Sequence, residues 1–189
     1  MVAAGRTASD RVLTDQRWTL YRLRRGAWSL NPEVADEFRR SVTRSGTPRR
    51  TAVYLTQPWV ELGLIDDRGY REHLDAVRRG CAAAGLTLQV RPHPVEDPGR
   101  YRGLELITGP QPAEVDARVV DAAVVLGGAS TALLNLAAVH GVPAIRVRLR
   151  EVDALDAAMS RRQASLFDAF VPLRAQASDL APLLARLGG

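Results

Sequence analysis

Residues 121–147, DAAVVLGGASTALLNLAAVHGVPAIRV, contain the pattern that decides the fold class. The run 121–126 is apolar and short, as expected of a buried strand, and two glycines follow it. Residues 130–140 have the composition and length of a helix, and 143–147 again suits a strand. A strand, a helix and a strand in succession predict a βαβ unit, in which a right-handed crossover joins two parallel strands.

The same alternation continues on both sides of this unit. In the segment 71–84, Leu74, Val77 and Cys81 recur at helical spacing, and a glycine follows the segment. We therefore predict a Rossmann-like α/β domain over residues 51–189, with a parallel sheet flanked by helices. The predicted strands are 51–56, 86–90, 104–107, 121–126 and 143–147, and the predicted helices are about 71–84, 112–120, 130–140 and about 177–187.

Residues 1–50 differ from the rest of the chain. The stretch RWTLYRLRRGAW (17–28) is basic and aromatic, and it predicts no strand. In NPEVADEFRRSV (31–42), Asn31 suits a helix N-cap and Pro32 the first helical position, and Gly46 and Pro48 are expected to stop the helix. We interpret this region as a basic connector that docks against another surface.

Composition excludes several classes of protein. The chain has 189 residues, 46% of them hydrophobic, which is enough for one domain with a substantial core, and an aromatic content of 5% argues against an all-β sandwich. Its one cysteine, Cys81, cannot form a disulfide framework or a cysteine zinc site, so we interpret it as a packing residue. No apolar stretch reaches the roughly 18 residues that span a bilayer, and no secretory signal opens the chain. We expect a cytoplasmic protein with at most peripheral membrane contact.

The positive charge of the chain has two interpretations. The formal net charge is +5, and all 26 basic residues are arginine. We favour arginine codon preference in a GC-rich genome as the explanation, and the alternative is a surface for phosphates, acidic glycans or anionic lipid. The arginines are scattered and carry no nucleic-acid-binding motif, so a nucleic acid is not the expected partner.

Three unusual loops follow predicted strands. They are Gln57-Pro58-Trp59, Arg91–Pro94 and Gly127–Thr131. Parallel strands end at one edge of a sheet, and ligands of such sheets bind outside that edge. We therefore expect the three loops to line one site.

The loop GGAST (127–131) suits an anion. Gly127 and Gly128 allow a sharp turn and the close approach of a ligand. Ser130 and Thr131 begin a helix, whose free N–H groups and dipole attract a phosphate or carboxylate. An ordinary strand-to-helix turn with a serine N-cap is the alternative interpretation.

His93 lies between two prolines in the loop RPHP (91–94). Prolines remove backbone donors and stiffen the loop, which would hold the imidazole at a fixed position. An imidazole can carry a proton near neutral pH and could neutralise or protonate a phosphate oxygen, whereas the alternative is a loop histidine bound to backbone. Arg91 could assist an anion site, although we favour a solvated side chain, and we expect His73 to be exposed.

Other polar residues give weaker signals. Gln57 and Glu61 could reach the crevice, although Glu61 could equally be a surface charge. His140 ends a predicted helix, where a partial positive charge is favourable. The acidic pairs in EDPGRY (96–101) and IDDRG (65–69) are interpreted as a turn and a helix start.

Together, QPWVELGLI (57–65) after a strand, RPHP (91–94), and GGASTALLNLAAVHGVPAI (127–145) resemble the C-terminal half of bacterial sialyltransferases and polysialyltransferases. These are GT-B enzymes, and the resemblance covers about residues 50–150. It implies a domain that binds the donor CMP-sialic acid, with transfer of sialic acid to a glycan hydroxyl and no metal or cofactor. It implies that His93 is catalytic and stabilises the leaving phosphate. The implied or candidate substrate-binding residues are Gln57, Arg91, Pro94, Gly128, Ser130 and Thr131.

The chain departs from this family at the acidic motif. Family members carry an Asp/Glu-Asp/Glu-Gly sequence in the N-terminal half, and no such sequence occurs here; IDDRG (65–69) is the nearest string. The chain thus resembles a donor-binding half whose partner half, on the same or another chain, supplies the base. The alternatives are a transferase for another nucleotide-activated donor, a non-catalytic nucleotide-binding module, and a nucleic-acid-binding protein selected by charge alone.

Overall fold

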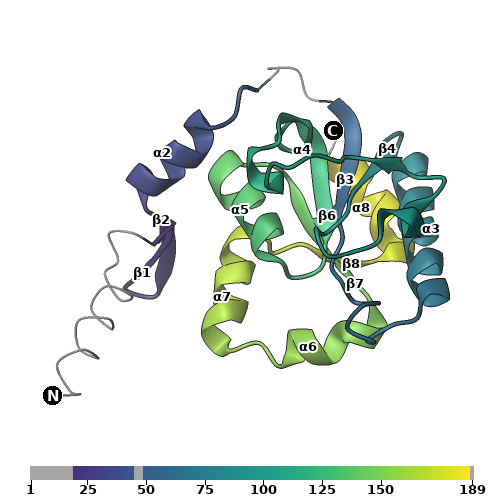
Figure 1. The fold of residues 1–189 in the computed structure, drawn as a ribbon. Coiled ribbons are helices and arrows are strands. Elements are labelled where there is room, and N and C mark those ends of the chain that lie inside the picture. The colour runs from purple at the N-terminus through teal and green to yellow at the C-terminus, as the bar shows by residue number, and fades with distance from the viewer. Residues whose placement is uncertain (1–18, 45–48, 188–189) are drawn as a thin grey trace, which may run out of the picture.

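The structure is a computed structural model that describes residues 19–44 and 49–187. Its centre is a six-stranded sheet in which all neighbouring strands are parallel (Figure 1). The Rossmann-like α/β class predicted from the sequence is confirmed. The strands are β3 (Arg49–Leu55), β4 (Thr87–Arg91), β5 (Glu105–Leu106), β6 (Ala122–Gly127), β7 (Ala144–Arg148) and β8 (Arg174–Gln176).

The order of the strands determines where a ligand can bind. The spatial order is β5-β4-β3-β6-β7-β8, which is 3-2-1-4-5-6 when the strands of this sheet are counted along the chain. The order reverses between β3 and β6, so the crossovers leave this point in opposite directions. A crevice is expected there, at the carboxyl ends of the two strands.

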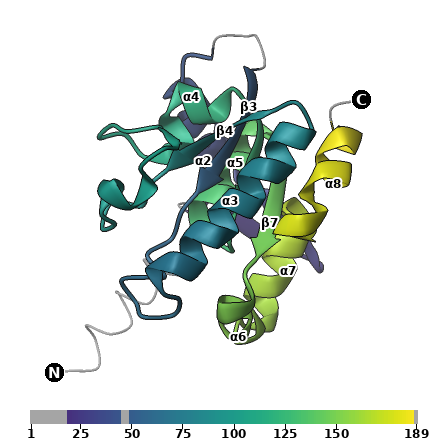
Figure 2. The same ribbon diagram turned by 90° about the vertical axis from the view of Figure 1, so that its right-hand side faces the viewer.

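Helices cover both faces of the sheet (Figures 1 and 2). On one face, α3 (Asp67–Ala83) and α8 (Leu180–Leu187) pack on a core that includes Tyr54 and Leu126. On the other face, α5 (Thr131–His140) and α7 (Arg161–Phe170) pack on a core that includes Val53 and Val125. The remaining helical elements of the sheet domain are η1 (Pro98–Tyr101), η2 (Ala113–Val115), α4 (Ala117–Val120), η3 (Arg150–Val152), α6 (Asp153–Ala157) and η4 (Ala177–Asp179).

Capping side chains explain where the structure departs from the predicted helix ends. The helix α3 starts before residue 71 because the Asp66 side chain accepts a hydrogen bond from the Gly69 N–H at 2.6 Å. The predicted helix 112–120 is divided in two because Asp116 caps α4 through the Arg118 N–H. Cys81 is fully buried in the core, as predicted.

The prediction of no strand before residue 50 is wrong. The strands β1 (Tyr21–Arg24) and β2 (Ala27–Leu30) form an antiparallel hairpin. Its turn residues Arg25 and Gly26 both have positive φ, 49° and 81°, as a two-residue hairpin turn requires. The helix α2 (Pro32–Arg40) follows with Pro32 at its start, as predicted, and ends at Arg40; the predicted stop residues Gly46 and Pro48 lie outside the described residues.

Residues 19–44 pack against the helical face formed by α5 and α7. The Tyr21 hydroxyl donates to Asn135 Oδ1 at 2.7 Å, and burial raises the pKa of this tyrosine. The indole of Trp28 donates to Ser165 Oγ on α7 at 3.0 Å. Asn135 in turn donates to the Glu114 carboxylate at 3.0 Å, so hydrogen bonds run from the hairpin through α5 to η2.

The helix α7 and the strand β8 are among the elements that were not predicted from the sequence. The helix α7 is capped by Ser160, whose hydroxyl accepts from the Gln163 N–H while the Gln163 side chain accepts from the Ser160 N–H. It leads into β8 at the edge of the sheet. Among the described residues, no helix is both long and apolar enough to cross a membrane.

The prediction that His73 is exposed is wrong, because only 8% of this residue is accessible. It lies on the buried face of α3, and its Nε2 and the Tyr54 hydroxyl are joined by a hydrogen bond of 2.9 Å. Burial lowers the pKa of His73 to about 4. Burial also lowers the pKa of His140, which opposes the positive charge expected at that helix end.

We expect His73 to make the protein acid-sensitive. The unfolded histidine has a pKa near 6.5 and the folded one about 4, so stability is full above pH 6.5 and falls as the pH drops toward 4. The loss is about 1.4 kcal/mol per pH unit in that window. The test is the free energy of unfolding, measured with denaturant at about pH 7 and about pH 4.5. Its decrease between these two pH values should be smaller in His73→Gln than in the unsubstituted chain, by about 2–3 kcal/mol. Equal losses in the two proteins would contradict a neutral, buried His73.

Candidate functional site

The three loops predicted to share an edge lie together on one cleft of about 780 Å³, here called the first cleft. It opens over the carboxyl ends of β3, β4 and β5 and the start of α5, next to the reversal of strand order between β3 and β6. This is the location at which open parallel sheets bind ligands. Of the candidate site residues, Gln57, Arg91, His93, Pro94, Ser130 and Thr131 line it, and Gly128 does not.

The backbone of His93 is held firmly while its side chain is exposed. Its N–H donates to the Thr56 hydroxyl at 2.9 Å and to the Glu96 carboxylate at 2.8 Å. Its Nδ1 accepts a long hydrogen bond, 3.5 Å, from the N–H of Val95. The imidazole is therefore presented to the cleft from a fixed backbone, which suits contact with a ligand.

Glu96 is one of the residues of this site that sequence reasoning missed. Its carboxylate is 5% exposed and lines the cleft. Besides the N–H of His93, it accepts from the Tyr101 hydroxyl at 2.7 Å and, through a short hydrogen bond, from the Thr56 hydroxyl. Burial and the bond to Glu96 both raise the pKa of Tyr101, which keeps this phenol a donor. One carboxylate thus fixes the ends of β3 and β4 together.

The solvated side chain favoured for Arg91 is not observed. Its guanidinium is 12% exposed and donates to the carbonyls of Ile107 and Gly109, each at 3.1 Å, and to that of Gln111 through a short bond. It also lies 3.6 Å from Asp116. Arg91 therefore holds the segment that forms one wall of the cleft, and its contact with a ligand stays a prediction.

The start of α5 combines a side-chain cap with N–H groups that the helix leaves without acceptors. The Ser130 hydroxyl accepts from the Leu133 N–H at 3.2 Å, which is the N-cap contact of the alternative interpretation. Thr131, the first helical residue, is exposed to the cleft. The N–H groups of Thr131 and Ala132 belong to the first turn, where no preceding carbonyl of the helix can accept from them.

The two glycines of GGAST serve packing rather than a sharp turn. Neither has a positive φ. A Cβ on Gly127 would lie 2.8 Å from the carbonyl oxygen of Leu55, and one on Gly128 would lie 2.6 Å from Cζ2 of Trp59 and 2.3 Å from Oε1 of Gln57. The space on the Cβ side of Gly128 is filled by the chain's own Trp59 and Gln57. Contact of Gly128 with a ligand stays a prediction.

Glu61 is a surface charge paired away from the first cleft. Its carboxylate accepts from the Arg100 guanidinium at 2.7 Å, and Arg100 also donates to Asp67 at 2.7 Å. The segment IDDRG supplies the cap and first residue of α3, as predicted for a helix start. Residues 98–101 of EDPGRY form the short helix η1, capped by Asp97, where a turn was predicted.

No family model matches this chain, and no curated protein or solved structure is significantly similar to it.

Proposed function

We propose that the first cleft binds a nucleotide-activated sugar, with CMP-sialic acid as the leading candidate, and that the chain is the donor-binding half of a glycosyltransferase. The observation that carries this proposal is the meeting of His93 and the start of α5 on one cleft beside the strand-order reversal. The sequence resemblance assigns the same residues to donor binding.

The phosphate of the donor would lie at the start of α5. A ten-residue helix has a positive dipole end, and its first N–H groups and the Thr131 hydroxyl can donate to phosphate oxygens. His93, on the loop across the cleft, would add a charged or hydrogen-bonding partner. When the bond between the sugar carbon and the phosphate oxygen breaks, the imidazole would stabilise or protonate the departing oxygen.

A carboxylate in the same cleft would favour a cytosine base over a uracil base. Glu114 lines the cleft, and its Oε1 already accepts from Asn135. A carboxylate can accept from the exocyclic amino group of cytosine, whereas uracil offers a carbonyl at that position. Glu114 would therefore discriminate between the two pyrimidines.

The acceptor hydroxyl must lose its proton to a base, and no Asp/Glu-Asp/Glu-Gly sequence is present to supply it. We therefore expect this chain to bind the nucleotide and, by itself, not to transfer the sugar. Addition of a partner half would restore transfer.

Calorimetric titration tests the proposal. CMP should bind more tightly than UMP and GMP, and Thr131→Ala and His93→Ala should each weaken CMP binding by about tenfold, because each removes a phosphate contact. Ser130→Ala should also weaken binding, but this variant additionally loses the N-cap of α5, which costs about 1 kcal/mol of stability. Thr87→Ala, at the exposed amino end of β4, is the matched control and should bind CMP unchanged.

Two results would overturn the proposal. One is a folded protein that binds none of the three nucleotides. The other is binding to any polyanion that falls steeply with salt and is the same in all variants, which would instead support the nucleic-acid alternative.

A further inference from the structure

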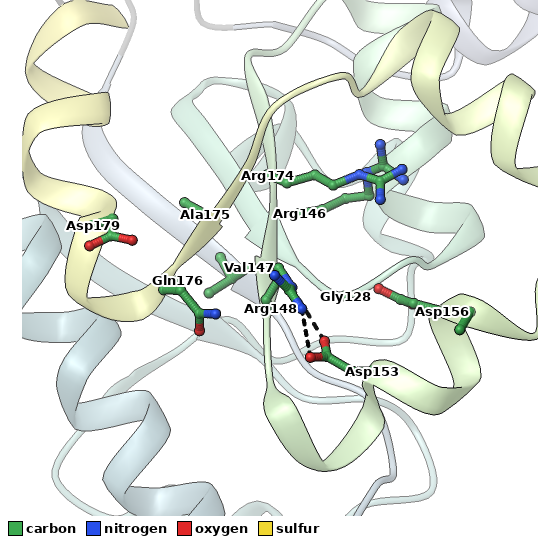
Figure 3. A pocket seen from close by; sticks show the side chains of 11 residues that line it. Gly128, Arg146, Val147, Arg148, Asp153, Asp156, Arg174, Ala175, Gln176 and Asp179 are labelled. Carbon is green, nitrogen blue, oxygen red and sulfur yellow. Dashed lines mark hydrogen bonds and ion pairs between the residues drawn. The ribbon is translucent and has the colours of Figure 1, made fainter.

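A second cleft, of about 570 Å³, is separate from the first and includes Gly128 in its lining (Figure 3). Gly128 lines it, whereas the next residue, Ala129, lines the first cleft. It opens between the carboxyl ends of β7 and β8 and the short helix α6, at the same edge of the sheet. Its charged lining residues are Arg146, Arg148, Asp153, Asp156, Arg174 and Asp179.

Two arginines face each other across β7 and β8. Arg146 and Arg174 are register partners in this parallel pair, and both donate to the same oxygen, Oδ1 of Asp168, each at 2.7 Å. Figure 3 shows the two guanidinium groups side by side, apart from the Arg148–Asp153 pair. Like charges on directly paired strand positions repel, so this arrangement requires an anion between them.

The anion present in the chain satisfies the arginines only in part. The Arg146 side chain is 3% exposed and stacks on Phe167, yet its buried Nε–H has no acceptor among the described residues. Asp168 itself is 57% exposed and uses one oxygen for both arginines. A buried donor without an acceptor is costly, so the Arg146 guanidinium retains a hydrogen bond to offer to an acceptor from outside the described residues.

Of the other charged side chains in the cleft, two pair with each other, and Asp156 lies within electrostatic range of the arginine pair. Arg148 and Asp153 form a two-point ion pair, with bonds of 2.6 and 3.3 Å. Asp179 accepts from the Ser178 hydroxyl at 3.1 Å. Burial raises the pKa of Asp156, and the charges of Arg146 and Arg174 act against that rise. The arginine pair is thus the part of the cleft that suits an added anion.

We propose that Arg146 and Arg174 form a binding site for the carboxylate or phosphate group of a small ligand, and that Asp168 is an internal competitor for this site. A planar carboxylate or a tetrahedral phosphate can accept from both guanidinium groups at once, which one oxygen of Asp168 does poorly. The site lies outside the first cleft and does not require that cleft to bind a nucleotide.

Because Asp168 competes with an added anion, removal of its charge should tighten anion binding. Asp168→Asn keeps the shape of the side chain but removes its charge, so it should bind an added anion about tenfold more tightly than the unsubstituted protein. Arg174→Met, at a half-exposed position, should bind it about tenfold more weakly. Arg186→Met, an exposed arginine on α8 outside the cleft, is the matched control and should change nothing.

The measurement is an NMR titration with inorganic phosphate and, separately, acetate at constant ionic strength. The readout is the Nε–H resonance of Arg146, identified by its loss in Arg146→Met. A stronger response to phosphate or to acetate names the ligand group, and either one supports the site when the variants change affinity as stated. Equal affinities for Asp168→Asn and the unsubstituted protein, or equal weakening by Arg174→Met and Arg186→Met, would overturn it. Circular dichroism of each variant confirms that the fold is intact.

Discussion

Replacing Glu96 with alanine is expected to lower the free energy of unfolding by about 3–5 kcal/mol, because it removes a buried charged acceptor that three donors in or near the core share. These donors are the hydroxyls of Thr56 and Tyr101 and the N–H of His93. Water cannot replace the carboxylate easily at a residue that is 5% exposed. Urea unfolding followed by circular dichroism measures the loss.

Two further variants isolate the cause. Glu96→Gln keeps the volume and one acceptor oxygen. Its free energy of unfolding should therefore lie between those of the unsubstituted chain and of Glu96→Ala. Glu105→Ala, at an exposed glutamate on β5, should stay within about 0.5 kcal/mol of the unsubstituted protein. If Glu96→Ala is as stable as Glu105→Ala, the carboxylate does not hold this edge of the sheet together.

Replacing Gly128 with alanine is expected to destabilise the protein by about 1–3 kcal/mol through overpacking. The new methyl group would lie 2.3 Å from Oε1 of Gln57 and 2.6 Å from Cζ2 of Trp59. The Gln57 amide can rotate away, but the indole is 4% exposed and has little space to move. Thermal unfolding gives the loss, and tryptophan fluorescence reports the displaced ring.

A double-mutant cycle shows whether the indole is the obstacle. Trp59→Phe removes the outer ring that the methyl group would contact, at the cost of a cavity. The double variant should therefore be more stable than the sum of the two single losses predicts, by at least about 0.5 kcal/mol. Additive losses would mean that the strain at Gly128 has another source.

The parallel core could be predicted from the sequence because its signals are local. The run 121–126 is apolar over a strand's length, and the 71–84 segment repeats apolar residues at helical spacing. The hairpin of residues 21–30 could not be predicted, because its turn uses Arg25 at positive φ rather than asparagine or aspartate before glycine. The strand β8 was missed because it is three residues long and two of them, Arg174 and Gln176, are polar.

The candidate site could be predicted only as a set of loops. Parallel strands end at one edge, so the placement of His93 and Thr131 at a common edge of the sheet follows from the parallel direction of the predicted strands. The partners of these loops depend on tertiary contacts that no local pattern encodes. Glu96 resembles a surface glutamate in the sequence, and nothing near Gly128 indicates that Trp59 fills the space beside it.

The hydrogen bonds from Tyr21 through Asn135 to Glu114 give the N-terminal hairpin a thermodynamic connection to the first cleft. Asn135 is 7% exposed, so opening of the hairpin would leave a buried amide with one partner lost and would loosen the carboxylate that lines the cleft. Local opening of the hairpin and of the cleft wall is therefore cooperative. A ligand held by Glu114 would slow hydrogen exchange in β1, a strand outside the cleft that it occupies.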